Sequence, residues 1–217
     1  MKIGTDGVLL GAWTPIDSSP KTILDVGSGT GLIALMLAQR VPESNLIAIE
    51  IEKTAADEAT DNFANSPWSN RLQLIHKDFI VYSEQTEDTF DLIISNPPFF
   101  KTSFKLPGTS RSAARDNYHL RYEDLFSCVN KLLNLHGSFV MVCPFEYRDD
   151  IMTLGNQNHL FLTKELLVRG TKSSSFKRIL MQFRRSKSSL STDELILDES
   201  RNKRTAKYQK LVTDFYL

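Results

Sequence analysis

The chain has 217 residues, of which 41% are hydrophobic and 24% are charged, and its formal net charge is zero. This length suits one domain with a sizeable core, and no apolar run is long enough to span a bilayer, so we exclude a membrane-embedded protein. Its two cysteines, Cys128 and Cys143, follow no secretory segment and have no close histidine, so we expect reduced thiols, a cytoplasmic location and no metal site.

Charge is distributed unevenly along the chain. Residues 1–163 contain 13 Lys and Arg against 20 Asp and Glu, whereas residues 164–210 contain 13 against 5. A basic region of this kind can attract a polyanion such as nucleic acid, although a solvated charged surface is the alternative explanation.

Strand-like and helix-like apolar patterns alternate along the chain, which predicts an α/β fold. The predicted elements, in chain order, are a strand at 22–26, a helix at 31–40, a strand at 46–50, a helix at 53–65, strands at 72–75 and 91–95, a helix at 122–134, a strand at 138–143, a helix at 146–156, and strands at 161–169 and 179–184.

Four further segments carry expectations. His136-Gly137 is predicted to turn from helix into strand, and the last two strands are predicted to form an antiparallel hairpin at the sheet edge. The polar segment 101–119 is longer than most loops, which favours a functional role. For residues 198–217 we expect a short helix or strand.

A glycine-rich turn, Leu24-Asp25-Val26-Gly27-Ser28-Gly29-Thr30-Gly31, joins the first strand to the first helix. Glycines let a ligand lie against the backbone, and the helix start offers free N–H groups to a carboxylate. A dinucleotide fingerprint would place its third glycine at position 32, where this chain has Leu32, so the spacing disfavours a nicotinamide cofactor. It resembles instead the first motif of class I S-adenosylmethionine-dependent methyltransferases. The cofactor-binding residues that this resemblance implies include Asp25, Gly27, Gly29 and Gly31 of this turn and, further along the chain, Phe79 and Asn96.

Acidic residues follow the next two strands. Glu50 is placed to accept hydrogen bonds from both hydroxyls of a ribose, because a carboxylate only accepts; a solvated acid is the alternative. Asp78 and Phe79 follow the third strand, where the resemblance places Asp78 at the adenine amino group of the cofactor, although Asp78 could equally cap a helix. The carboxyl ends of adjacent strands are where open α/β sheets bind ligands.

The fourth strand runs into Asn96-Pro97-Pro98-Phe99. The prolines fix the backbone and keep Asn96 out of helical conformation. The Asn96 carboxamide oxygen and the Pro97 carbonyl can both accept from one planar amino group, and Phe99 offers a face for stacking. This arrangement suits adenine or a side-chain amide; an ordinary proline-terminated strand is the alternative.

With these motifs in register, the chain resembles a class I amino-methyltransferase. More specifically, it resembles the bacterial tRNA(Val) adenine-N6-methyltransferase family, which modifies adenine 37 beside the anticodon and whose members usually carry further residues ahead of the opening segment. The segments that carry this likeness are Met1–Trp13, Ala114-Arg115, His119-Leu120 and Glu123-Asp124-Leu125.

This resemblance implies one domain, residues 1–217, built on a doubly wound, mostly parallel, seven-stranded sheet with an antiparallel edge hairpin. It also implies S-adenosyl-L-methionine as cofactor, tRNA as partner, and a monomer without metal. Residues 1–20 would lie beside the cofactor and 164–190 would form a basic hairpin. The residues expected at the methionine end of the cofactor are Thr5, Asp6 and Gly7, for which a capped first helix is an equal alternative. The catalytic residues expected are Asn96, Pro97 and Phe99. The residues expected to contact RNA phosphates are Arg111, Arg115, Lys172, Lys177 and Arg178.

Other activities share parts of this pattern. Protein glutamine N5-methyltransferases use the same type of clamp, in which asparagine and proline oxygens accept hydrogen bonds from one amino group, usually with a tyrosine where this chain has Phe99. An rRNA adenine-N6-methyltransferase and an inactive RNA-binding module are further alternatives. A DNA target is disfavoured, because the sequence contains no added target-recognition domain.

Overall fold

A computed structural model of the protein describes residues 4–98, 120–201 and 203–215. The helices are α1 (Thr5–Trp13), α2 (Leu32–Arg40), α3 (Lys53–Ala64), α4 (Phe79–Gln85), α5 (Tyr122–Leu132), α6 (Arg148–Gln157) and α7 (Ala206–Val212). The strands are β1 (Thr22–Val26), β2 (Asn45–Glu50), β3 (Leu72–His76), β4 (Phe90–Ser95), β5 (Leu133–Pro144), β6 (Phe161–Arg169), β7 (Phe176–Arg184), β8 (Ser191–Ile196), β9 (Asp198–Ser200) and β10 (Lys203–Arg204). Within these ranges, no helix has the length and apolar content needed to cross a membrane.

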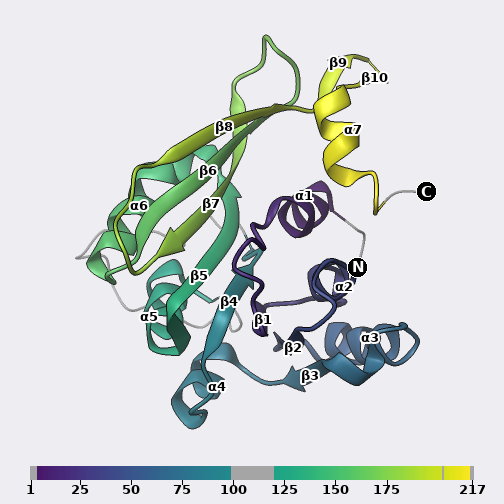
Figure 1. The fold of residues 1–217 in the computed structure, drawn as a ribbon, viewed down its shortest axis with the longest axis vertical. Helices are drawn as coiled ribbons and strands as arrows, with labels where there is room; N and C mark the ends of the chain where they lie inside the picture. The colour runs from purple at the N-terminus through teal and green to yellow at the C-terminus, as the bar shows by residue number, and fades with distance from the viewer. Residues whose placement is uncertain (1–3, 99–119, 202, 216–217) are drawn as a thin grey trace, which may run out of the picture.

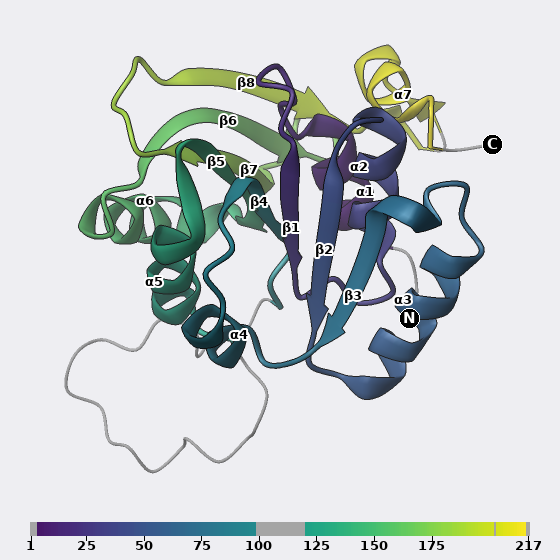
Figure 2. The same cartoon turned by 60° about the horizontal axis from the view of Figure 1, so that its bottom comes forward.

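Eight strands form one mixed sheet in the order β3-β2-β1-β4-β5-β7-β6-β8. Strands β1 to β5 are parallel to one another, and Figure 2 shows β1, β2 and β3 side by side. Strand β7 is antiparallel to both β5 and β6. The strand order reverses between β1 and β4, so the fold is doubly wound and its switch point lies where these two strands end. This confirms the predicted α/β class.

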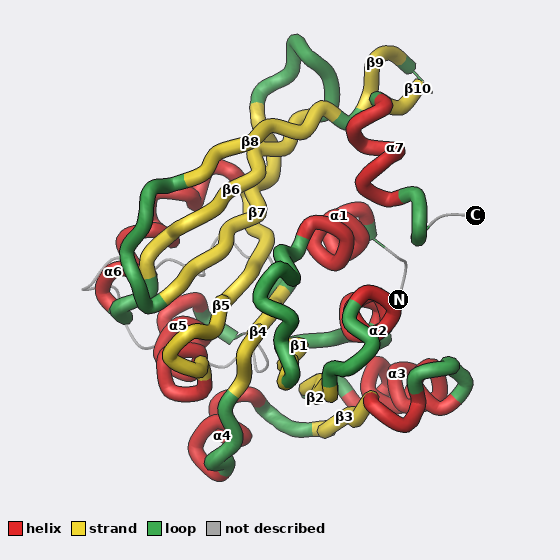
Figure 3. The backbone as a smooth tube through the Cα atoms, in the orientation of Figure 1, coloured by secondary structure: helices red, strands yellow, loops and turns green. Residues whose placement is uncertain are grey.

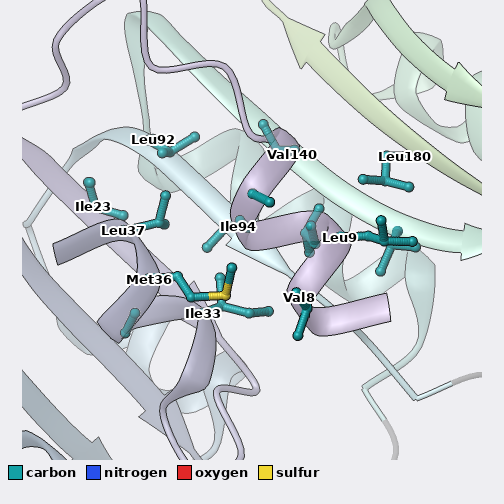
Figure 4. Packing of buried hydrophobic residues seen from close by; sticks show 14 of the residues in the cluster. Val8, Leu9, Ile23, Ile33, Met36, Leu37, Leu92, Ile94, Val140 and Leu180 are labelled. Carbon is teal, nitrogen blue, oxygen red and sulfur yellow. The ribbon is translucent and has the colours of Figure 1, made fainter. Parts of the chain in front are cut away.

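Helices cover both faces of the sheet, of which Figure 3 shows β5, β7, β6 and β8 side by side in yellow. Helices α1, α2 and α7 contribute to the hydrophobic cluster on one face, and α4, α5 and α6 contribute to the cluster on the other; the two groups lie on opposite sides in Figure 1. Figure 4 shows Leu9 of α1 and Leu37 of α2 beside Ile94 of β4, and all three are buried. The first helix is therefore part of the core.

The predicted strand number and sheet edge were wrong. The sheet has eight strands rather than seven, because β8 pairs in parallel with β6. Strands β6 and β7 do form the predicted antiparallel hairpin, but β8 is the edge strand. The sequence of β8 is mostly polar, and Leu195 is its one fully buried residue, so the strand lacks the apolar alternation that would have revealed it.

The predicted turn at His136-Gly137 was also wrong. Helix α5 ends at Leu132, and β5 begins at once because Leu133 pairs with Phe90 of β4. The register then shifts, so that Leu92 pairs with Ser138. The turn-like residues between these two pairs lie inside an irregular strand.

Candidate active site

The glycine turn between β1 and α2 has left-handed backbone at three positions. Gly27, Gly29 and Gly31 have φ angles of +68°, +57° and +82°, a region where a side chain is strained. A Cβ at Gly27 would meet no described atom within 4 Å, whereas at Gly31 it would lie 2.4 Å from Phe63 Cε1. Gly27 therefore borders open space that a ligand can occupy, and Gly31 is required for packing.

Glu50 at the end of β2 holds this turn in place. Its Oε2 accepts from the Gly29 amide at 2.7 Å, and its Oε1 accepts from the amides of Ile51 and Glu52 at 2.9 and 2.8 Å. A carboxylate has about four acceptor sites, and three are used here, so about one remains for a hydroxyl. The structural role of Glu50 was not predicted from the sequence, and its binding of ribose stays a prediction.

Asp25 is fully buried beneath the turn. Its Oδ2 accepts from the Ala34 amide at 3.1 Å, which satisfies one of the free donors at the start of α2. The pKa of Asp25 is raised to about 7, mainly because burial desolvates its charge; the Ala34 hydrogen bond opposes this rise, and the negative charge of Glu50 adds to it. Asp25 Oδ1 and Ser28 Oγ are buried without hydrogen-bond partners among the described residues. Unsatisfied polar atoms at an open glycine turn fit the polar amino-acid end of S-adenosyl-L-methionine.

Strand β4 brings Asn96 to the same place. Val26 and Ser95 are paired neighbours, and Ser95 Oγ donates to the Val26 carbonyl at 2.9 Å. Asn96 is partly exposed and Pro97 is buried. A Cβ at Gly7 of α1 would lie 3.9 Å from Asn96 Nδ2. The glycine turn, the segment Asn96-Pro97-Pro98 (the asparagine elbow) and the start of α1 are therefore adjacent.

Two other predicted site residues form an ion pair. Arg178 Nε donates to Asp6 Oδ2 at 2.8 Å, which joins a predicted cofactor residue to a predicted RNA residue. Thr5 begins α1 and is exposed. The individual roles predicted for these residues stay predictions.

The residues that follow β3 have visible structural roles. Asp78 caps α4, since its Oδ1 accepts from the amides of Ile80 and Val81 at 2.7 and 3.1 Å. Phe79 packs in the core with 5% exposure. Contact of either residue with a cofactor stays a prediction.

The remaining predicted residues divide into two groups. Lys172 and Lys177 are exposed near the turn between β6 and β7. Phe99, Arg111 and Arg115 lie outside the described residues. In the part of the chain that the structure covers, no cluster of three or more His, Cys, Asp or Glu side chains could hold a metal ion.

Comparison with known proteins agrees with this geometry. Residues 8–143 match the family model of the methyltransferase small domain. A predicted O-methyltransferase from Agrobacterium tumefaciens is structurally similar, with a TM-score of 0.75, 17% identity and 96% of both chains covered. A TehB-like SAM-dependent methyltransferase from Corynebacterium glutamicum gives a TM-score of 0.56 at 18% identity, covering 84% of this chain and 89% of that one. Fold and site thus define a Rossmann-like methyltransferase.

Sequence relatives narrow the class. The tRNA1(Val) (adenine(37)-N6)-methyltransferase of Flavobacterium psychrophilum is 43% identical over 217 residues, covering 100% of this chain and 93% of that protein. The Bacteroides fragilis protein with the same name is 43% identical over 218 residues, covering 100% of this chain and 91% of that protein. The chain belongs to the family of tRNA1(Val) (adenine(37)-N6)-methyltransferases.

Proposed function

We propose that this protein transfers a methyl group from S-adenosyl-L-methionine to N6 of adenine 37 in tRNA(Val). The observation that carries the proposal is the placement of Asn96 beside the glycine turn, where Ser95 is hydrogen-bonded to Val26 at 2.9 Å. The full-length similarity to relatives with this name supports adenine in tRNA as the target.

The residues of the chain would act mainly by binding and alignment. S-adenosyl-L-methionine, when bound, supplies a methyl group on a sulfonium that is already activated, so the reaction requires no general base. Asp25, Glu50 and the glycine turn would hold that cofactor. Asn96 Oδ1 and the Pro97 carbonyl would accept hydrogen bonds from the adenine amino group, favouring the geometry in which the nitrogen lone pair can attack. Phe99 would stack on the base.

The RNA must present its base to this pocket. An adenine in a tRNA loop has to leave its stack to reach Asn96, which is the usual way in which proteins read single-stranded loops. We propose that Arg111, Arg115, Lys172 and Lys177 contact the phosphates. We also propose that the protein acts as a monomer in the cytoplasm, which light scattering and cell fractionation can test.

The direct experiment is to incubate total tRNA with labelled cofactor and to map the labelled nucleoside. We expect N6-methyladenosine at position 37 of tRNA(Val). Asn96→Ala should lower turnover by at least about 100-fold while cofactor affinity stays within about twofold, because the proposed hydrogen bonds of its side chain are made to the acceptor. Unchanged turnover of that variant would rule out the clamp.

Hydrolysis of the methylated product separates the alternatives. A labelled glutamine side chain would indicate a protein N5-methyltransferase, and label in rRNA would indicate the other RNA target. Glu50→Gln should weaken cofactor binding in calorimetry, because the amide replaces one acceptor oxygen with a donor. Equal binding by this variant would reject the ribose role of Glu50.

A further inference from the structure

An ion pair spans the active-site end of the sheet, between the first turn of α1 and strand β7. The side chains of Asp6 and Arg178 meet at 2.8 Å and keep 25% and 35% exposure. Arg178 lies opposite Pro144, the last residue of β5. It therefore stands at the carboxyl ends of the parallel strands, where the glycine turn and Asn96 also lie.

Arg178 reaches α1 because of the face on which it lies. Side chains two positions apart on a strand point to the same face, so Arg178 shares a face with Leu180. Leu180 belongs to the hydrophobic cluster that contains Leu9 of α1, and Figure 4 shows both residues in it. Ile94 of β4 belongs to that cluster too, and Asn96 follows it by two positions. The ion pair and the asparagine elbow are thus on the same side of the sheet.

Among the described residues, few other polar contacts hold the first turn of α1. In the described structure Gly4 precedes the helix without a side-chain cap, and the first helical hydrogen bond, from the Val8 amide to the Gly4 carbonyl, is long at 3.4 Å. Gly7 follows Asp6 directly and lies against Asn96 and Leu32: a Cβ there would be 3.9 Å from Asn96 Nδ2 and 3.6 Å from Leu32 Cδ2. A shift of this turn would move one wall of the Asn96 site.

We infer that the Asp6–Arg178 ion pair anchors the first turn of α1 against Asn96, so that Arg178 is a positioning residue for methyl transfer. For the reaction itself, this inference rests on the proposed function. The guanidinium is held at two atoms, since Nε binds Asp6 and Nη1 donates to the Lys177 carbonyl at 3.0 Å. This arrangement favours a fixed structural role over direct contact with an RNA phosphate.

A double-mutant cycle tests the inference. Asp6→Asn and Arg178→Gln should each lower kcat for tRNA methylation by roughly 10-fold to 100-fold. The kcat of the double variant should be no lower than that of the less active single variant, because each of the three variants removes the same ion pair. The KM for tRNA should change by less than about twofold. Lys203→Gln removes the same charge from an exposed pair with Glu199, and it should leave both constants unchanged.

Two results would overturn the inference. Losses that multiply in the double variant would mean that the residues act separately. A raised KM for tRNA in Arg178→Gln, with no change in Asp6→Asn, would assign Arg178 to phosphate contact instead.

Amide hydrogen exchange over residues 5–13 gives a readout that does not need the reaction. Exchange should be faster, and by the same factor, in the three variants of the cycle, while Lys203→Gln should match the wild type. Unchanged exchange would reject the anchor. A wild-type protein that fails to methylate tRNA would reject the proposed function and leave this readout valid.

Discussion

Two glycines of the same turn differ in what surrounds them. A Cβ at Gly27 would meet no described atom within 4 Å, whereas one at Gly31 would lie 2.4 Å from Phe63 Cε1. Both have positive φ, so alanine is strained at either position. We expect Gly27→Ala to lower the free energy of unfolding by about 1 kcal/mol, and Gly31→Ala by on the order of 3 kcal/mol because of the added clash.

The loss of cofactor affinity should be larger for Gly27→Ala than for Gly31→Ala, which is the opposite of the order expected for stability. The methyl group of Gly27→Ala would point into the open space where the cofactor is proposed to lie, so affinity should fall by at least about 10-fold. Adding Phe63→Leu to Gly31→Ala should restore part of the lost stability, because it removes the ring atoms that the new methyl group would meet. Adding Phe63→Leu to Gly27→Ala should restore none of the lost cofactor affinity. Urea denaturation and calorimetry measure the two quantities, and equal stability losses in the two glycine variants would contradict the assignment.

Asp25 should make stability depend on pH. Its pKa rises from 3.8 in a free side chain to about 7 in the folded protein, because burial disfavours its charge. Between these values the folded state binds more protons than the unfolded chain, so stability falls as the pH rises through this window and levels off above it. Asp25→Asn should remove this fall and raise the free energy of unfolding at pH 8 by on the order of 2 kcal/mol.

The same variant should bind the cofactor less tightly, because Asp25 lies at the proposed cofactor site with an unsatisfied oxygen. Denaturation at pH 3 is the internal control, since Asp25 is then mostly protonated in both states and the two proteins should be nearly equal. A stability gain that is the same at pH 3 and pH 8 would show that charge is not its cause.

At the scale of elements, the helices and strands with a clear apolar periodicity could be predicted from the sequence. The strands at 161–169 and 46–50 and the helix at 53–65 agree closely with β6, β2 and α3, because each has a clear apolar pattern. Helix α4 and strand β8 were not predicted, since α4 is short and β8 is polar. The glycine turn was predictable because positive φ selects glycine, whereas the Glu50–Gly29 and Asp6–Arg178 contacts join residues that are far apart in sequence.

Strand β8 is held by a polar network that the sequence could not reveal. Glu165 of β6 is 3% exposed, accepts from Arg148 Nε and Nη2 at 2.8 and 3.0 Å, and accepts from Thr192 of β8 at 2.9 Å. Glu165→Ala should lower the free energy of unfolding by about 2 kcal/mol, because it leaves Arg148 and Thr192 without this partner. Chemical denaturation measures the loss.

Asp149 provides a matched control for this network. It also contacts Arg148, at 3.0 Å, but its side chain is 84% exposed. Asp149→Ala should therefore change the free energy of unfolding by less than about 0.5 kcal/mol. Equal losses in the two variants would mean that burial of Glu165 does not determine the strength of the contact.

At the scale of the molecule, the basic carboxyl-terminal region is less available than its charge suggests. Several of its cations are bound to carboxylates; these pairs are Arg169–Glu194, Arg178–Asp6, Lys203–Glu199, Arg204–Asp198 and Lys207–Asp193. A cation that is already paired with a carboxylate is less available to neutralise an RNA phosphate, so it displaces fewer counterions from the RNA when the RNA binds. Formal charge therefore overstates the number of phosphate contacts that this region can make.

The salt dependence of tRNA binding can show whether the position of individual lysines or the overall charge of this region governs RNA binding. Lys172→Gln and Lys177→Gln should each reduce the slope of log Kd against log salt concentration by roughly 0.7 to 0.9, because both lysines are exposed near the turn between β6 and β7 and are proposed to contact phosphates. Lys203→Gln and Lys207→Gln remove the same formal charge from existing pairs and should change the slope much less. Fluorescence anisotropy between about 50 and 200 mM salt gives the slopes. Equal changes in all four variants would mean that the overall charge of this region, rather than the position of its lysines, governs RNA binding.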